Sequence, residues 1–181
     1  MDKKFFFQIV GLLILIFGAT ILTFNQSLIP NLGNTTKPLP SPVGNLQNVV
    51  QIIDPASQQI KAQVLVEIAD TKETRGLGLG GRSSLPAESG MLFIMEKRSK
   101  PTFWMKGMLI PLDFIWIDGN QIADVLEHIQ PPVAGQSDQT LQLYSPSKDV
   151  DRVLEVNSGY IASHVIKVGD LIKVAQIAPT K

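Results

Sequence analysis

The sequence LDFIWIDGNQIADVL occupies residues 112–126 and contains two apolar segments joined by a short turn. The turn has Gly119 at its centre, and glycine readily takes the positive φ that tight hairpin turns require. In the first segment Phe114 and Trp116 alternate with two isoleucines, so both faces of the expected strand are apolar. We therefore predict a β-hairpin whose first strand is central in a sheet and covered on both sides.

Similar strand signals fill the chain after residue 60. The segments are short, rich in β-branched and aromatic residues, and bounded by Gly, Pro, Asn or Asp. The predicted strands are residues 62–69, 90–95, 102–106, 112–118, 121–129, 141–144, 152–156 and 170–177. Helix signals are fewer: Asp70 and Glu73 form a capping-box-like start for a helix through about Leu77, and a second short helix is expected at residues 159–164. The pattern predicts a mainly β fold, a compact β-sandwich or barrel-like domain with one or two short helices.

The N-terminal part of the chain has the composition of a membrane anchor. The twenty residues from Phe5 to Phe24 carry no charge, and a helix rising 1.5 Å per residue over this length spans the roughly 30 Å core of a bilayer. Lys3 and Lys4 precede the segment, so the positive-inside rule places the N-terminus in the cytoplasm. A cleaved signal peptide is the alternative, but its apolar region is usually only about 7–15 residues long. We therefore predict one uncleaved transmembrane helix within residues 1–24.

Residues 25–48 have the composition of a flexible linker. They include four prolines, two glycines and five asparagines but only one charged residue, and such a segment buries too little apolar surface to fold. A coil of 24 residues has an r.m.s. end-to-end distance of roughly 25–30 Å. We therefore expect residues 49–181 to form one β domain tethered to the cytoplasmic membrane, on its outer side.

The composition argues against several classes of function. After residue 48 there are 13 Lys and Arg against 15 Asp and Glu, so no basic surface for nucleic acid is indicated. The chain has no cysteine, which excludes disulfides, thiolate metal sites and a catalytic thiol. Its two histidines, His128 and His164, are 36 residues apart and form no metal-binding motif, so we expect no metal and no cofactor. No serine lies in a Gly-x-Ser-x-Gly elbow.

A series of short motifs runs through the predicted domain. They are VEIADT at residues 66–71, RGL at 75–77, RSSLP at 82–86, GMLF at 90–93, FWMK at 103–106, PLD at 111–113, ID at 117–118, LEVN at 154–157 and GD at 169–170. In this order the motifs resemble the domain-of-unknown-function family 192 of bacteria and archaea, from about residue 62 to residue 174. The chain departs from the family pattern at GLGG, residues 78–81, with about two extra residues, and at Gly107. The resemblance implies a compact, mainly β domain, often exported or membrane-tethered, with no established reaction, ligand or cofactor.

Two carboxylates interrupt otherwise apolar predicted strands. Asp113 and Glu155 would be costly to bury unless they are paired or functional. Arg75, Arg82 and Lys106 are the cations available to pair with them. A structural salt bridge and a functional site are both compatible with this pattern.

The predicted strand at residues 102–106 alternates in character. Phe103 and Met105 share one face, whereas Trp104 and Lys106 share the other. Trp104 and Lys106 either line a ligand groove or cover an edge with their apolar parts buried and their polar tips in water. The candidate ligand-binding residues are therefore Trp104, Lys106, Asp113, Glu155, Arg82 and Arg75.

These observations favour a non-catalytic module that binds a small polar ligand or assembles with an envelope partner. Two alternatives stay open. An extracytoplasmic hydrolase requires Asp113 and Glu155 to face a common cleft, with unequal pKa values. A purely structural domain requires no cleft at all.

Overall fold

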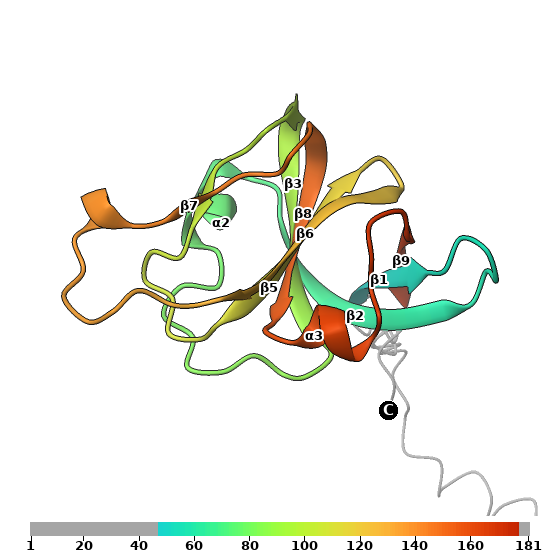
Figure 1. Ribbon diagram of the computed structural model, residues 1–181, viewed down its shortest axis with the longest axis horizontal. Helices are drawn as coiled ribbons and strands as arrows, with labels where there is room; N and C mark the ends of the chain where they lie inside the picture. Colours follow the sequence, from blue (N-terminus) through green and yellow to red (C-terminus); the bar gives the residue numbers. More distant parts are fainter. Residues whose placement is uncertain (1–46, 178–181) are drawn as a thin grey trace, which may run out of the picture. The chain divides into compact units, whose positions relative to one another are not determined.

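The computed structural model describes residues 47–177, which form a mainly β domain with two short α-helices (Figure 1). In chain order the elements are β1 (Gln47–Ile53), β2 (Ile60–Ala69), α2 (Lys72–Leu77), β3 (Ser89–Ser99), β4 (Phe103–Trp104), β5 (Leu112–Asp118), β6 (Gln121–Ile129), the 3₁₀ turn η1 (Asp138–Thr140), β7 (Leu143–Tyr144), β8 (Val150–Asn157), α3 (Tyr160–Ser163) and β9 (Leu171–Ile177). The mainly β class with short helices is confirmed. The predicted anchor at residues 1–24 and nearly all of the predicted linker at residues 25–48 lie outside the described residues. Within residues 47–177, no helix is both long enough and apolar enough to cross a membrane.

Seven strands form one curled sheet in the spatial order β1-β2-β3-β8-β5-β6-β9 (Figure 1). Neighbouring strands are antiparallel except β2 and β3, which run parallel because α2 lies in the crossover between them. β9 pairs with β1 along its whole length, whereas it meets β6 only at the pair Leu171–Gln121. The sheet therefore closes on itself through a single residue pair. β4 and β7 form a separate two-stranded ladder.

The predicted hairpin is present with the predicted bounds. β5 and β6 pair antiparallel, and Gly119 in the turn between them has a φ of 59°. β5 lies between β6 and β8, and its residues from Leu112 to Ile117 are all buried. The prediction of a central strand covered on both sides is confirmed.

Two hydrophobic clusters cover the two faces of this strand. The inner cluster is enclosed by the curl of the sheet and includes Val64, Ile115 and Leu154. The outer cluster includes Phe114 and Val153 and is covered by segments outside the sheet. Because side chains alternate along a strand, neighbouring residues of β5 and β8 belong to different clusters. Alternation therefore decides which side of the sheet each residue of β8 reaches.

The structure contains one strand that was not predicted and shortens another that was. β1 begins at Gln47, inside the predicted linker, where Val49, Val50, Ile52 and Ile53 favour a strand and pairing with β2 and β9 orders it. The strand predicted at residues 102–106 is reduced to Phe103–Trp104. It ends there because the chain turns at Gly107, which has a φ of 70°. The Met108 N–H closes this turn by donating to Met105 O at 3.1 Å.

The first helix is present but begins one residue later than predicted. Thr71, not Asp70, is the N-cap: its hydroxyl accepts the Thr74 N–H at 3.1 Å, and the Thr74 hydroxyl accepts the Thr71 N–H at 3.0 Å. This is a capping box made by two threonines, which fills the role predicted for Asp70 and Glu73. The helix ends as predicted at the glycine run, because Gly78 has a φ of 52°.

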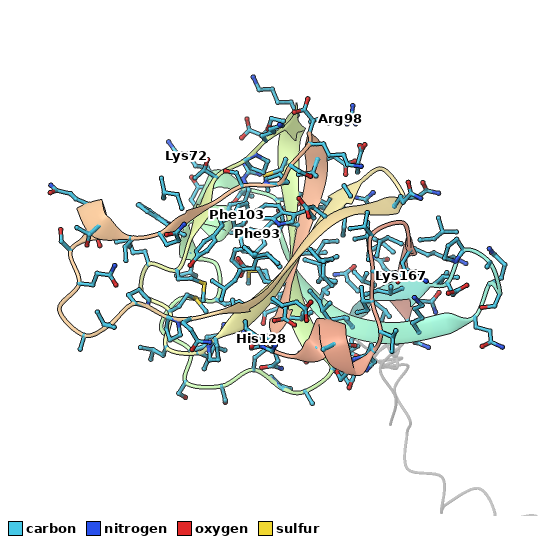
Figure 2. All side chains as sticks on the ribbon, viewed as in Figure 1. Lys72, Phe93, Arg98, Phe103, His128 and Lys167 are labelled. Atoms are coloured by element: carbon cyan, nitrogen blue, oxygen red, sulfur yellow. The ribbon has the colours of Figure 1, made fainter. Side chains whose placement is uncertain are left out.

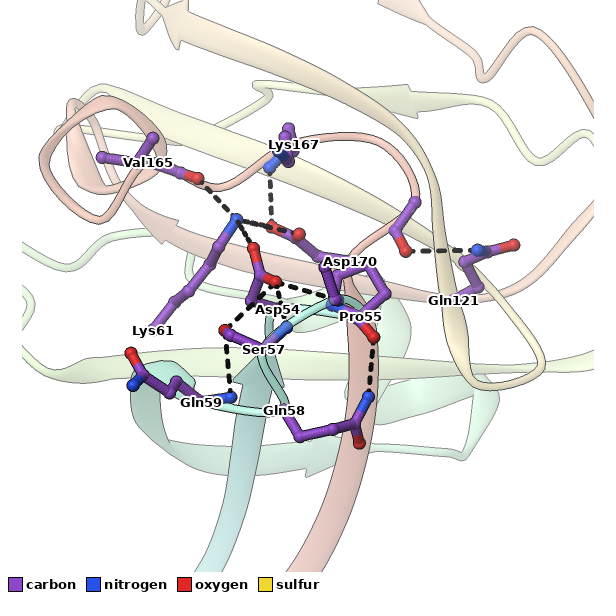
Figure 3. A network of polar contacts seen from close by, with 12 residues as sticks. Asp54, Pro55, Ser57, Gln58, Gln59, Lys61, Gln121, Val165, Lys167 and Asp170 are labelled. Carbon is purple, nitrogen blue, oxygen red and sulfur yellow. Dashed lines mark hydrogen bonds and ion pairs between the residues drawn. The ribbon is translucent and has the colours of Figure 1, made fainter.

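A polar network fixes the region where β1, β2 and β9 meet (Figure 3). Lys61 Nζ lies 2.8 Å from each carboxylate oxygen of Asp170, which is fully buried, and 3.0 Å from Val165 O. The same ammonium lies 3.7 Å from Asp54, whose carboxylate accepts backbone N–H groups in the β1–β2 turn. The charge of Asp170 is therefore compensated where β9 begins, next to the closure of the sheet.

Candidate functional site

A pocket of about 230 Å³ opens on the side of the sheet that carries the outer cluster. It lies between α2 with the glycine-rich segment that follows it, strands β3 and β4, and the turn after β4. Its lining includes the run from Arg75 to Gly80, the aromatic residues Phe93, Phe103 and Trp104, the methionines Met95 and Met108, and the charged residues Lys106 and Glu155. Four of the six candidate residues therefore line one pocket: Arg75, Trp104, Lys106 and Glu155.

The aromatic part of the lining is held rigidly by ring contacts. Phe103 meets Phe93 edge to face, with ring centroids 5.1 Å apart, and Figure 2 shows the two side chains together. Phe103 also meets Phe114 and Trp116 edge to face, at 5.8 and 5.4 Å. Edge-to-face pairs of this kind stabilise a defined arrangement of rings. Trp104 differs from these residues because its side chain is half exposed at the rim.

Glu155 lies within the sheet and lines the same pocket. On β8 it is flanked in register by Met91 of β3 and Phe114 of β5, both members of the outer cluster. The residue is only 5% exposed. Among residues 47–177, no cation and no hydrogen-bond donor compensates its carboxylate, and burial is the one influence that shifts its pKa.

Burial raises the pKa of Glu155 to about 8, because transfer from water disfavours the charged form. At neutral pH the side chain is therefore mainly a neutral carboxylic acid. In this form it can donate one hydrogen bond and accept others. A ligand that supplies a positive charge can instead convert it to the carboxylate.

The predicted pairing of the candidate cations with Asp113 or Glu155 is corrected. Arg75 Nη2 lies 2.6 Å from Glu96 Oε1, and its Nη1 donates to the backbone oxygens of Asp70 and Ile94.

Lys106 and Arg82 also have other partners. The turn after β4 carries Lys106 outward, where its Nζ lies 2.6 Å from Asp138 Oδ2 and 5.4 Å from the centre of the Trp104 ring. Arg82 makes a bidentate pair with Glu67, at 2.5 and 2.8 Å, and is absent from the pocket lining.

Asp113 has a structural environment. It is fully buried, its Oδ1 accepts the backbone N–H of His128 at 2.8 Å, and its Oδ2 accepts that of Ile161 at 3.0 Å. These two bonds join the end of β6 to the start of α3. His128 has a positive φ of 57°, so the bond from Asp113 helps to hold a backbone conformation that few side chains favour.

The glycine run after α2 forms one wall of the pocket. The sequence predicted only a helix end and a turn for this segment. Gly78 lies beside the ring of Phe93, where a Cβ would make an ordinary contact at 3.5 Å with Phe93 Cζ, and its φ of 52° is what favours glycine at this position. The departure from the family pattern at residues 78–81 was a signal of unusual local structure, but nothing in the sequence linked it to β3.

Other polar groups lie outside the pocket. His128 Nδ1 lies 2.8 Å from Ser158 Oγ, and the Tyr160 hydroxyl donates to Glu88 at 2.8 Å. In the part of the chain that the structure describes, no three His, Asp or Glu side chains come together in a way that could hold a metal ion.

A family model named DUF192 and described as "Uncharacterized ACR" matches residues 53–174. The chain belongs to this family. The resemblance inferred from the motifs is thus confirmed, and the matched span of DUF192 contains every residue that lines the pocket. No curated protein matches the chain.

Two solved structures share the fold. A proposed transcription regulator from Sinorhizobium meliloti 1021 is 26% identical with a TM-score of 0.62, and the match covers 71% of this chain and 93% of that one. A protein of unknown function from Novosphingobium aromaticivorans DSM 12444 is 27% identical with a TM-score of 0.60, covering 74% of this chain and 89% of that one. Both similarities support the mainly β fold of the DUF192 domain.

Proposed function

We propose that this DUF192 domain is a non-catalytic module that binds a small ligand in the pocket beside Glu155. The observation that carries the proposal is the state of this one side chain: it is 5% exposed, lines the pocket and has no compensating group among the described residues. No side-chain oxygen of the described residues is both sealed from solvent and unpaired, so the unpartnered carboxyl group of Glu155 is accessible to a ligand in the pocket. Strongly shifted carboxyl groups in pockets are typical of functional sites.

The pocket has the composition of a ligand site. Three aromatic rings and several apolar side chains form part of its walls, and glycine backbone and three charged side chains form the rest, so the pocket offers both apolar and polar contacts to a small molecule. Its volume of about 230 Å³ is below the roughly 300–1,000 Å³ of sites for drug-sized ligands. The ligand is therefore small.

A hydrolase with a carboxylate pair is less well supported. Asp113 is held by two backbone N–H groups inside the sheet, and the pocket lining contains Glu155 as its one carboxylate. A second carboxylate is thus missing from the described lining of the pocket, and general acid–base hydrolysis by two carboxylates requires one.

The proposed setting is the outer face of the cytoplasmic membrane. The charge-free segment from Phe5 to Phe24, preceded by two lysines, supports a membrane anchor with the domain on the far side. The Pro- and Asn-rich segment after it supports a flexible tether. A tethered pocket of this kind would sample small solutes of the envelope.

A thermal-shift screen tests the proposed binding. The full chain, in an uncharged detergent, is screened against amines, amino acids, sugars, carboxylates and nucleotides, beside Glu155→Gln and the control Glu127→Gln, which changes an exposed carboxylate of β6 outside the pocket. A ligand at 100 times its Kd stabilises the fold by about 2.7 kcal/mol. We expect at least one compound to stabilise the wild type and Glu127→Gln but not Glu155→Gln. If no compound does so, the binding proposal is wrong.

A further inference from the structure

We infer that the ligand carries a small ammonium group, which enters the pocket between the Phe93, Phe103 and Trp104 rings and pairs with the Glu155 carboxylate. This inference rests on the proposed binding function and names the chemistry of the ligand. It follows from which groups in the pocket already have partners and which do not.

The two cations in the lining are already compensated. Arg75 and Lys106 each lie 2.6 Å from a carboxylate oxygen, that of Glu96 and that of Asp138. An anionic ligand would compete with these carboxylates for the two cations. Among the charged or titratable residues of the lining, Glu155 has no partner within residues 47–177. A ligand that pairs with it must therefore supply a positive charge or a hydrogen-bond donor.

The aromatic walls favour a cation over a neutral donor. The face of an aromatic ring carries negative potential and attracts an ammonium group, and this attraction grows when water is excluded. Lys106 Nζ already lies 5.4 Å from the centre of the Trp104 ring, so a ligand cation would share this ring with Lys106 and would contact mainly Phe93 and Phe103. Phe93 and Phe103 line the same pocket as the buried acid and contact each other edge to face. An alkylammonium group fits both features, because its charge can pair with the carboxylate and can also contact the aromatic rings.

Binding of an ammonium ion would expel a proton. Glu155 is mainly protonated at neutral pH, so the neutral acid and the ammonium ion must give the carboxylate paired with the ammonium ion and one proton released to solvent. The ligand and the proton therefore compete for the same carboxylate. The other charged groups that face the pocket are Arg75 from α2 and Lys106 from the turn after β4, and both are held by partners of their own.

Calorimetry with matched probes tests this inference. The full chain in an uncharged detergent is titrated with methylammonium, tetramethylammonium and n-pentylammonium chlorides, and with 1-pentanol and sodium pentanoate as neutral and anionic analogues of the last. With a Glu155 pKa of about 8, the affinity of the best ammonium probe should rise about tenfold from pH 6 to pH 7, about fivefold from pH 7 to pH 8, and less than about twofold from pH 8 to pH 9. Titrations at pH 7 in buffers of different ionisation enthalpy should show about 0.9 proton released per ammonium bound.

The variants separate this mechanism from general binding. Glu155→Gln should weaken ammonium binding at pH 8 at least about tenfold and remove its pH dependence, because the amide carries no charge. Glu127→Gln should leave both unchanged, since that residue lies outside the pocket.

Three other outcomes would show that the ligand class, the ion pair or the binding function itself is wrong. If pentanol or pentanoate binds more tightly than every ammonium probe and depends on Glu155, the ligand class is wrong while the binding function stands. If ammonium probes bind with no change between pH 6 and pH 9, or equally well to Glu155→Gln, the inferred ion pair is wrong. If neither these probes nor any compound of the broader screen binds, the proposed function fails and this inference fails with it.

Discussion

Asp113 and Glu155 lie on adjacent strands but face opposite sides of the sheet. Asp113 of β5 is in register with Val156 of β8, a member of the inner cluster, whereas Glu155 is in register with Phe114 of the outer cluster. The two acids therefore share no cleft, and their buried carboxyl groups are stabilised in different ways. Asp113 is satisfied by backbone donors of the domain itself, while Glu155 remains neutral at the pocket.

Removing the Asp113 carboxylate should destabilise the fold. Asp113→Ala leaves the N–H groups of His128 and Ile161 without their acceptor, and each unsatisfied buried group costs about 1–3 kcal/mol. We expect the free energy of unfolding to fall by about 2–5 kcal/mol, measured by urea denaturation. The control Asp149→Ala, at an exposed position, should change it by less than about 0.5 kcal/mol. Equal small effects for both variants would show that Asp113 is not a structural acceptor.

Glu155 should make stability fall as pH rises. Its pKa in the folded state, about 8, lies above its ordinary value of 4.5, so between these values the folded protein holds a proton that the unfolded chain has released. The contribution is fully present below about pH 4.5, is lost as pH rises to about 8, and changes by up to about 1.4 kcal/mol per pH unit in between.

Glu155→Gln should remove this dependence. The difference between variant and wild type in unfolding free energy should grow in favour of the variant from pH 5 to pH 8, as measured by urea denaturation at each pH. Parallel pH profiles for the two proteins would contradict the assignment of a raised pKa to Glu155.

Breaking the Lys61–Asp170 pair should weaken the closure of the sheet. Lys61→Met leaves the fully buried Asp170 carboxylate with only the Lys167 N–H, at 2.9 Å, as a donor. Removing one partner of a buried ion pair typically costs about 3–5 kcal/mol. The double variant Lys61→Met, Asp170→Asn should recover part of this loss. A double variant less stable than Lys61→Met would show that charge compensation is not what the pair provides.

The membrane tether is tested by topology. A reporter fused after Lys181 should be active only when the reporter works outside the cytoplasm, and N-terminal sequencing of the mature protein should find the segment from Phe5 to Phe24 retained. Recovery of a chain that begins within residues 25–48 would show cleavage and remove the anchor.

Local signals predicted much of the sheet. The bounds of β5 and β6 agree with the sequence because alternation, aromatic content and a glycine turn are all local properties. β1 was not predicted, although Val49, Val50, Ile52 and Ile53 favour a strand, because the linker composition was extended to residue 48. Its pairing with β9, more than 100 residues away in sequence, has no local signal.

The candidate site was only partly predictable for a related reason. Glu155 was found because a lone carboxylate in an apolar strand is unusual, and the FWMK motif located Trp104 and Lys106. Both faces of β5 are apolar, however, so alternation alone could not tell which face each acid occupies. The partners of the cations are set by the positions of loops, and the turn at Gly107 moved Lys106 away from the sheet.

The titration of Glu155 itself shows whether this side chain is a neutral acid without a partner at the pocket. The full chain is labelled with ¹³C at the glutamate side-chain carboxyl carbons, and Glu155 is assigned by comparison with Glu155→Gln. We expect a titration midpoint near pH 8 that moves to lower pH when an ammonium probe is added. A midpoint near the ordinary value of 4.5, unchanged by any probe, would show that Glu155 is an ordinary ionised carboxylate.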